Sequence, residues 1–240
     1  VGLSYNNEFD ATFFRYSYSS LKTSPQIYQY ELNENKNKIV WKKQVNNFFD
    51  TNYEVKRIKT VSRDQTEVPV SLVYKKGTEL KNAPMLIYGY GSYGINMDSG
   101  FRSSITPLLE RGFIYAIAQI RGGADMGRNW YENGRMQNKN NTFFDFIDAT
   151  KFLIDNQIGN KDEIFAMGGS AGGLLMGAIM NYEPELYKGV VSAVPFVDVL
   201  TTMSDESIPL TTFEYDEWGN PNIEEEYFYM KTYSPYDNIK

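Results

Sequence analysis

The sequence predicts an α/β domain with a mostly parallel, doubly wound sheet, preceded by a short all-β segment. Three observations lead to this prediction. Continuous apolar runs, such as residues 83–91 and 113–123, end in glycines, and segments with helical spacing of apolar residues, such as 141–157, lie between them. The first sixty residues instead contain short β-like runs divided by turn signals. Fully apolar strands that alternate with helices are typical of a parallel sheet covered on both faces.

The all-β segment is predicted over residues 1–58. Its β-like runs are ATFFRYSYSS, QIYQYEL and KIVWKKQ, and the polar stretch 33–38 is predicted as a hairpin loop. These runs suit an antiparallel meander, because no helical segment separates them as a parallel crossover would require. The α/β domain is then predicted over residues 59–240.

Within the α/β domain the elements follow in a regular order. Asn141 or Thr142 is the plausible N-cap of the longest predicted helix. The predicted helices are residues 103–112, 141–157 and 171–181, and the predicted strands are residues 68–74, 83–91, 113–123, 163–169 and 188–199.

Composition excludes several classes of function. The chain has 240 residues, no cysteine, no histidine and a net charge of −6. A disulfide framework, thiolate chemistry and a zinc site of the usual kind are therefore not expected, and no metal or other cofactor is predicted. The negative charge argues against nucleic acid and anionic membrane as partners and leaves room for a basic substrate. No apolar run is long enough to span a bilayer.

Residues 168–172, with the sequence GGSAG, form a G-x-S-x-G pattern between a predicted strand and a predicted helix. In a nucleophile elbow, such a pattern holds a serine on a sharp turn where larger neighbours would clash. Ser170 would be the nucleophile, and the backbone N–H of Ala171 would stabilise an oxyanion. The alternatives are a tightly packed strand-to-helix turn or a phosphate-binding turn. Nucleotide binding is less favoured, because no Walker lysine and no G-x-G-x-x-G pattern accompany it.

A second glycine-rich turn, YGYGSYG, follows the predicted strand at residues 83–91. Folds with a nucleophile elbow keep their other oxyanion donor at this point. Here Tyr90 could supply a phenol O–H. The alternative is a tight turn with packed tyrosines.

Acidic residues crowd the stretch from 205 to 217, and Tyr215 and Trp218 accompany them. A guanidinium group prefers a planar carboxylate partner and an aromatic face, so the stretch is a candidate pocket for a basic side chain. A solvated acidic loop is the alternative. The residues of the stretch are Asp205, Glu206, Glu214, Tyr215, Asp216, Glu217 and Trp218, of which Asp205 and Glu206 are expected to serve structure.

Several motifs together resemble the prolyl oligopeptidase family of serine peptidases, and most of all its oligopeptidase B branch. They are YGYGSYG, AIAQIRGGADMG, MGGSAGGLLMG, VPFVDVLTTMSDESIPLT and EYDEWGNP. The resemblance implies an α/β-hydrolase peptidase domain, with the first fifty or so residues as the end of a β-propeller. It also implies a cytoplasmic oligopeptidase that cleaves short basic peptides after Arg or Lys through an acyl-enzyme.

The resemblance also implies roles for single residues. Where the family often has Glu, this chain has Asp216, and Gly100 stands where a second acid would accompany Asp98. The implied roles are nucleophile for Ser170, oxyanion donor for Tyr90 and Ala171, pocket wall for Tyr93 and Phe196, acid for a basic side chain for Glu214 and Asp216, and second-subsite acid for Asp98.

The general base is missing from this sequence. In α/β-hydrolases the triad follows the order Ser, Asp, His, yet no histidine follows Ser170. We therefore expect the hydrolase domain to be C-terminally incomplete, inactive alone, and partnered by a missing C-terminal segment. A catalytically inactive module that binds basic peptides and a small-ester hydrolase of the same fold are the alternative functions.

Overall fold

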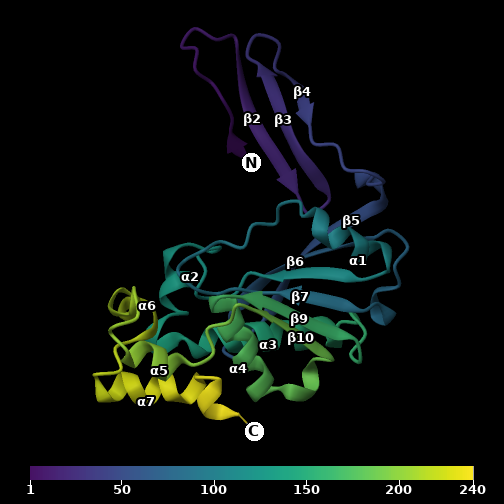
Figure 1. Cartoon of the computed structure of the whole chain (residues 1–240). Coiled ribbons are helices and arrows are strands. Elements are labelled where there is room, and N and C mark those ends of the chain that lie inside the picture. The colour runs from purple at the N-terminus through teal and green to yellow at the C-terminus, as the bar shows by residue number, and fades with distance from the viewer. Residues whose placement is uncertain (240) are drawn as a thin grey trace.

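The computed structural model describes residues 1–239, and they form two separate sheets (Figure 1). The smaller sheet is antiparallel, with the strand order β1-β2-β3-β4. Consecutive strands are neighbours, so this sheet is the predicted meander. Its strands are β1 (Gly2–Leu3), β2 (Phe13–Ser20), β3 (Thr23–Glu31) and β4 (Lys36–Lys42).

The larger sheet has six strands in the order β10-β9-β7-β8-β6-β5. The four strands from β10 to β8 are parallel, whereas β6 is antiparallel to β8 and β5 is antiparallel to β6. The mostly parallel sheet predicted from the sequence is confirmed. Its strands are β5 (Tyr53–Val61), β6 (Glu67–Lys75), β7 (Met85–Tyr88), β8 (Ile114–Ala118), β9 (Ile164–Gly169) and β10 (Gly189–Ala193).

Strand β5 was not among the predicted elements. Its sequence, YEVKRIKTV, is rich in exposed charged side chains because it forms one edge of the sheet. The predicted boundary between residues 58 and 59 falls inside β5, which pairs with β6 along its whole length. The strand therefore belongs to the larger sheet on both sides of that boundary.

The predicted helices are present with shifted ends. Neither Asn141 nor Thr142 caps α3, because both lie inside the helix. The hydroxyl of Thr142 instead donates to the carbonyl of Arg121 at 2.9 Å. The strand predicted over 188–199 is shorter, because Val194 has a φ of 41° after β10, and a helix begins at Val199. The helices are α1 (Thr106–Glu110), α2 (Arg128–Glu132), α3 (Asn140–Asp155), α4 (Ala171–Tyr182), α5 (Val199–Ser204), α6 (Tyr215–Trp218) and α7 (Glu224–Tyr233).

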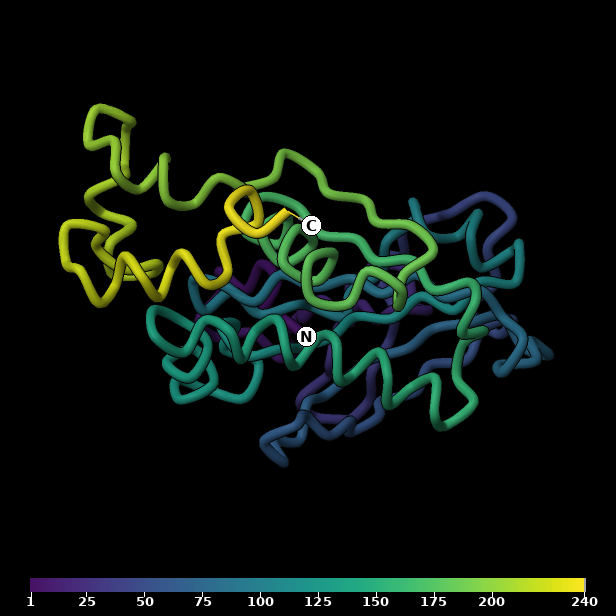
Figure 2. Tube along the Cα trace, turned by 90° about the horizontal axis from the view of Figure 1, so that it is seen from below, coloured from purple at the N-terminus to yellow at the C-terminus, as the bar shows by residue number. Residues whose placement is uncertain are grey.

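The two faces of the larger sheet carry separate cores. In β8, Ala116 packs in the cluster that includes residues of α3 and α4, whereas Tyr115 and Ile117 pack in a cluster on the side of α1. Alternation of this kind follows from the two-residue period of a strand. Figure 2 shows the end of the chain that follows α7 next to α4, where the amide of Asn181 donates to the carbonyl of Pro235 at 3.0 Å.

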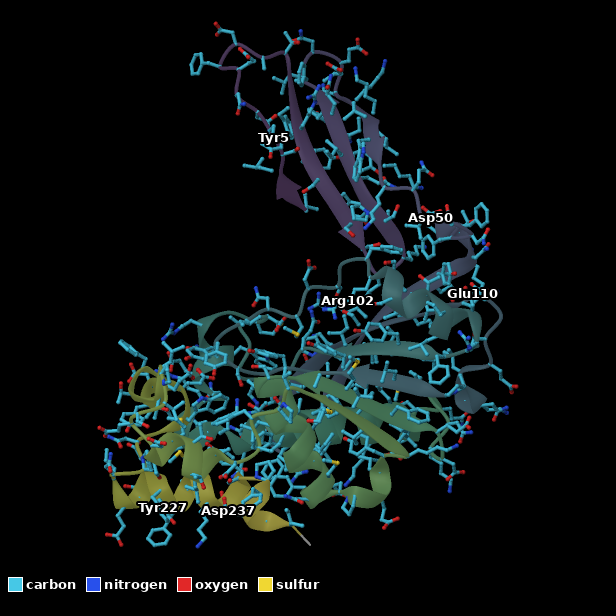
Figure 3. The ribbon with its side chains drawn as sticks, viewed as in Figure 1. Tyr5, Asp50, Arg102, Glu110, Tyr227 and Asp237 are labelled. Carbon is cyan, nitrogen blue, oxygen red and sulfur yellow. The ribbon has the colours of Figure 1, made fainter. Side chains whose placement is uncertain are left out.

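The smaller sheet projects away from the α/β part and touches it at one end (Figure 3). At the junction, the Phe48 ring stacks on Tyr53 with a centroid separation of 4.8 Å. The hydroxyl of Ser19 in β2 accepts the backbone N–H of Phe101 at 3.0 Å. The labelled Asp50 and Arg102 lie near this junction, and the labelled Tyr227 lies at the far side of the molecule (Figure 3). No helix within residues 1–239 is both long and apolar enough to cross a membrane.

Candidate active site

Ser170 lies between the end of β9 and the start of α4, where its side chain is exposed. Its backbone has φ 56° and ψ −117°, a strained conformation for a residue with a Cβ. The turn is held from three sides, because Ser170 accepts backbone hydrogen bonds from Gly173 and Phe196 and donates one to Ala193. The sharp, exposed turn expected of a nucleophile elbow is therefore present.

The glycines around Ser170 are required by close backbone approaches. A Cβ on Gly168 would overlap the carbonyl oxygen of Gly172, and a Cβ on Gly172 would lie 2.8 Å from the carbonyl oxygen of Gly89. Gly169 has more space, since its Cβ would be 3.4 Å from the nearest atom. The G-x-S-x-G pattern thus lets the elbow and the end of β7 pack against each other.

Two groups near Ser170 can donate to a developing oxyanion. Ala171 is the first residue of α4, where backbone N–H groups have no partner four residues earlier in the helix. Tyr90 is half-buried, and burial raises the pKa of its phenol, although the nearby hydroxyl of Ser170 lowers it. The raised pKa keeps the phenol protonated at neutral pH, so it can donate a hydrogen bond.

A cavity of about 240 Å³ opens beside Ser170. Of the residues predicted for the site, it is lined by Ser170, Tyr93, Phe196 and Glu214. The sequence did not indicate most of the remaining wall, because these residues are ordinary apolar and small side chains. They are Thr202, Met203, Ile208, Pro209, Leu210 and Thr211. Trp218, which the sequence did indicate as an aromatic partner, completes the wall.

Glu214 supplies the carboxylate of the cavity, and aromatic residues fix it there. Its Oε2 accepts the hydroxyl of Tyr93 at 2.7 Å and the indole N–H of Trp218 at 2.9 Å. Burial and the carboxylate together raise the pKa of the Tyr93 phenol far above its ordinary value, so Tyr93 remains a donor. Among residues 1–239 no cation forms an ion pair with Glu214.

Two predicted binding residues lie elsewhere. Asp98 and Asp216 are both exposed, and neither lines the cavity. In the helical turn of α6, Asp216 points to a different side from Glu217, the neighbouring acid, which is 4% exposed. Glu217 accepts the backbone N–H of Tyr93 at 2.9 Å and the hydroxyl of Tyr131 at 2.6 Å. The density of acids in this stretch indicated Glu217 as one candidate among several, and only the fold shows which acids face inward.

The geometry combines an exposed, strained serine, two groups that can donate to an oxyanion and a pocket with a fixed carboxylate. The model of the prolyl oligopeptidase family matches residues 99–240, which contain all of these groups except Tyr90 and Tyr93. The chain belongs to this family. Its α/β-hydrolase fold is accordingly that of prolyl oligopeptidases.

Individual members of the family are similar along most of this chain. Dipeptidyl aminopeptidase BI of Pseudoxanthomonas mexicana is 48% identical over the whole chain, and Protease 2 of Moraxella lacunata is 57% identical over 74% of it. The structure of oligopeptidase B from Leishmania major superposes with a TM-score of 0.90 and 45% identity, covering 97% of this chain. The chain spans 34%, 26% and 33% of the length of these three proteins.

Proposed function

We propose that this chain carries the nucleophile and the specificity pocket of a serine oligopeptidase that cleaves peptides after Arg or Lys. The observation that carries the proposal is the position of Glu214, whose carboxylate lines the same cavity as Ser170. A basic side chain in this cavity would meet a carboxylate already held in place by two donors. Fixed, partly desolvated carboxylates bind guanidinium and ammonium groups strongly.

The aromatic wall supports the same substrate class. The Phe196 and Trp218 rings lie 5.2 Å apart, and Trp218 meets Tyr93 edge-on at 5.6 Å. Such rings can cover the aliphatic stem of Lys or Arg and the flat face of a guanidinium. An acidic side chain in the cavity would be repelled by the carboxylate of Glu214.

The proposed reaction is acyl transfer through Ser170. Its Oγ attacks the carbonyl carbon of the scissile bond, and the resulting oxyanion accepts hydrogen bonds from Ala171 N–H and Tyr90 O–H. The Oγ proton passes to a general base and then to the leaving amine; water later releases the acyl group. Because these 240 residues contain no histidine, a histidine base must come from outside them, and the isolated chain is proposed to be inactive.

Paired substrates and a paired variant test the specificity. In the full-length protein, Glu214→Gln should lower kcat/KM on a substrate with Arg before the scissile bond by about 30-fold, equivalent to ~2 kcal/mol. A substrate with a neutral residue there should change far less. Glu206→Gln is the matched control, because Glu206 is an exposed acid of the same stretch outside the cavity. Equal losses on both substrates would make Glu214 a structural residue.

The alternatives predict different results with the wild-type protein. A catalytically inactive module would bind basic peptides but leave Ser170 unlabelled by a fluorophosphonate. A small-ester hydrolase would cleave short neutral esters with no preference for Arg, and Glu214→Gln would not affect it. Product analysis on a basic peptide longer than three residues would show whether cleavage is internal or releases N-terminal dipeptides, as the name of the Pseudoxanthomonas relative indicates for that protein.

A further inference from the structure

Lys139 is a buried ammonium behind the candidate active site. The residue is 1% exposed and lies just before α3. Its Nζ donates to Gly91 O at 2.6 Å, to Ser92 Oγ at 2.8 Å and to Gly134 O at 3.2 Å. An ammonium group has three N–H donors, so all of them are used.

Two of the three acceptors belong to the turn that connects the oxyanion donor with the pocket. Gly91 and Ser92 stand between Tyr90, which faces Ser170, and Tyr93, which holds Glu214. Position 91 requires glycine, because its φ is 72° and a Cβ there would overlap the side chain of Thr142. The ammonium therefore fixes the short segment on which the spacing of the two tyrosines depends.

The same ammonium also contacts the pocket from behind. Nζ lies 4.9 Å from the centroid of the Trp218 ring, a distance suited to a cation–π contact. Trp218 is 1% exposed, and its indole N–H holds Glu214. Lys139 is thus in contact with both the oxyanion turn and the carboxylate support of the pocket.

Packing alone does not explain why a charged side chain, and not an apolar one, occupies position 139. Glu217 is the acid that attracts Lys139, but no ion pair within 4.0 Å joins them among residues 1–239. Burying an ammonium without a carboxylate in contact costs several kcal/mol, and an apolar side chain of the same length would avoid that cost. The three hydrogen bonds and the ring contact are what the charge provides.

We propose that Lys139 is a positioning residue that sets the oxyanion tyrosine relative to the pocket, so that it supports the turnover of every substrate. This inference rests on the proposed peptidase function. It separates Lys139 from Glu214, whose effect should be confined to basic substrates.

Lys139→Met tests the proposal in the full-length protein, because methionine keeps the length of the side chain and removes the charge and the donors. We expect kcat to fall roughly tenfold or more on both an Arg substrate and a neutral substrate, since small displacements of catalytic groups have effects of this size. KM should change less than kcat. Lys151→Met is the matched control on α3, where Lys151 forms a half-exposed ion pair with Glu183, and it should stay within about twofold of wild type.

A second readout separates positioning from mere stability. A peptide aldehyde with Arg at its end forms a hemiacetal with the hydroxyl of Ser170, and the former carbonyl oxygen then occupies the oxyanion site. The corresponding peptide alcohol cannot form this adduct. Lys139→Met should weaken aldehyde binding by roughly tenfold and alcohol binding by much less. Active-site titration corrects both values for the folded fraction. A variant with a lower melting temperature but an unchanged ratio of the two affinities would show a purely structural role and overturn the proposal.

Ser92→Ala decides the matter if Lys139→Met does not fold, because it removes only one acceptor of the ammonium. We expect a smaller loss of kcat, about threefold, on both substrates. A folded variant with unchanged kcat overturns the inference.

If wild type cleaves the neutral substrate but not the Arg substrate, the proposed specificity fails and the neutral substrate still decides the role of Lys139. A wild-type protein that cleaves neither overturns both proposals.

Discussion

At the scale of single residues, the elbow is governed by which positions tolerate a Cβ. Gly168 and Gly169 are neighbours in β9, yet only Gly168 would place a Cβ on another backbone atom. Sequence alone shows two equivalent glycines. The difference arises because alternate residues of a strand face opposite sides of the sheet, and only one side lies against the turn of Gly172.

This asymmetry predicts unequal effects of two adjacent substitutions. Gly168→Ala should lower the free energy of unfolding by about 3 kcal/mol and abolish labelling of Ser170 by a fluorophosphonate, because backbone must move to admit the methyl group. Gly169→Ala should cost less than about 1 kcal/mol and retain labelling. Thermal unfolding and labelling of both variants in the full-length protein provide the comparison. Similar losses in both would mean that the turn has room to relax.

The titration of Lys139 gives a second prediction at this scale. Burial lowers its pKa from 10.5 to about 8, against the attraction of Glu217. Between these two values the unfolded chain still binds a proton that the folded chain has released, so the contribution of Lys139 to stability rises with pH. The difference in stability between wild type and Lys139→Met should therefore shift in favour of wild type as the pH rises from 8 to 10. A constant difference across this range of pH would contradict the lowered pKa.

At the scale of elements, a buried ion pair joins the end of β8 to α3. Asp145 is fully buried and accepts from Arg121 through both carboxylate oxygens, at 2.8 Å from Nε and 2.6 Å from one terminal nitrogen. Asp64, which precedes β6, binds the other terminal nitrogen at 2.6 Å. Three segments distant in sequence are thus tied together next to the turn that Lys139 holds.

Removal of one partner of this pair should be costly. Asp145→Ala leaves the Arg121 guanidinium buried with only the half-exposed Asp64, so we expect a loss of about 3 kcal/mol in the free energy of unfolding. Glu67→Ala, which breaks the exposed ion pair with Lys59, should change stability by less than about 1 kcal/mol. Denaturation of both variants under the same conditions measures the contrast. Equal effects would show that the buried pair does not stabilise the junction.

At the scale of the whole molecule, one edge of the larger sheet and the part of one face next to it are incompletely covered within residues 1–239. Strand β10 forms the edge, and its Val191 is 52% exposed. On the same part of the sheet, Phe165 and Met167 of β9 are only half-buried. An open edge with apolar side chains can pair with another chain.

The polypeptide of residues 1–240 on its own should therefore self-associate in solution, and Ser170 should react slowly with a fluorophosphonate because the chain has no histidine. Light scattering with size-exclusion chromatography and a labelling time course measure both properties. Val191→Lys should reduce the association, because a charge on an edge strand opposes pairing. A monomeric polypeptide that labels as fast as the full-length protein would contradict both expectations.

The sequence by itself determined the class of fold and the position of the turn that carries Ser170, the candidate nucleophile. Apolar runs and glycine punctuation are local signals, and they correctly predicted five strands of the larger sheet and the turn at Ser170. The charged edge strand β5 lacked that signal. Tertiary structure alone decided which of the clustered acids line the cavity. Glu214 lines it, Asp216 does not, and Glu217 is buried outside the cavity lining. It also brought Lys139 beside Gly91, a contact without any sequence signature, because the direction of a side chain depends on how distant segments pack.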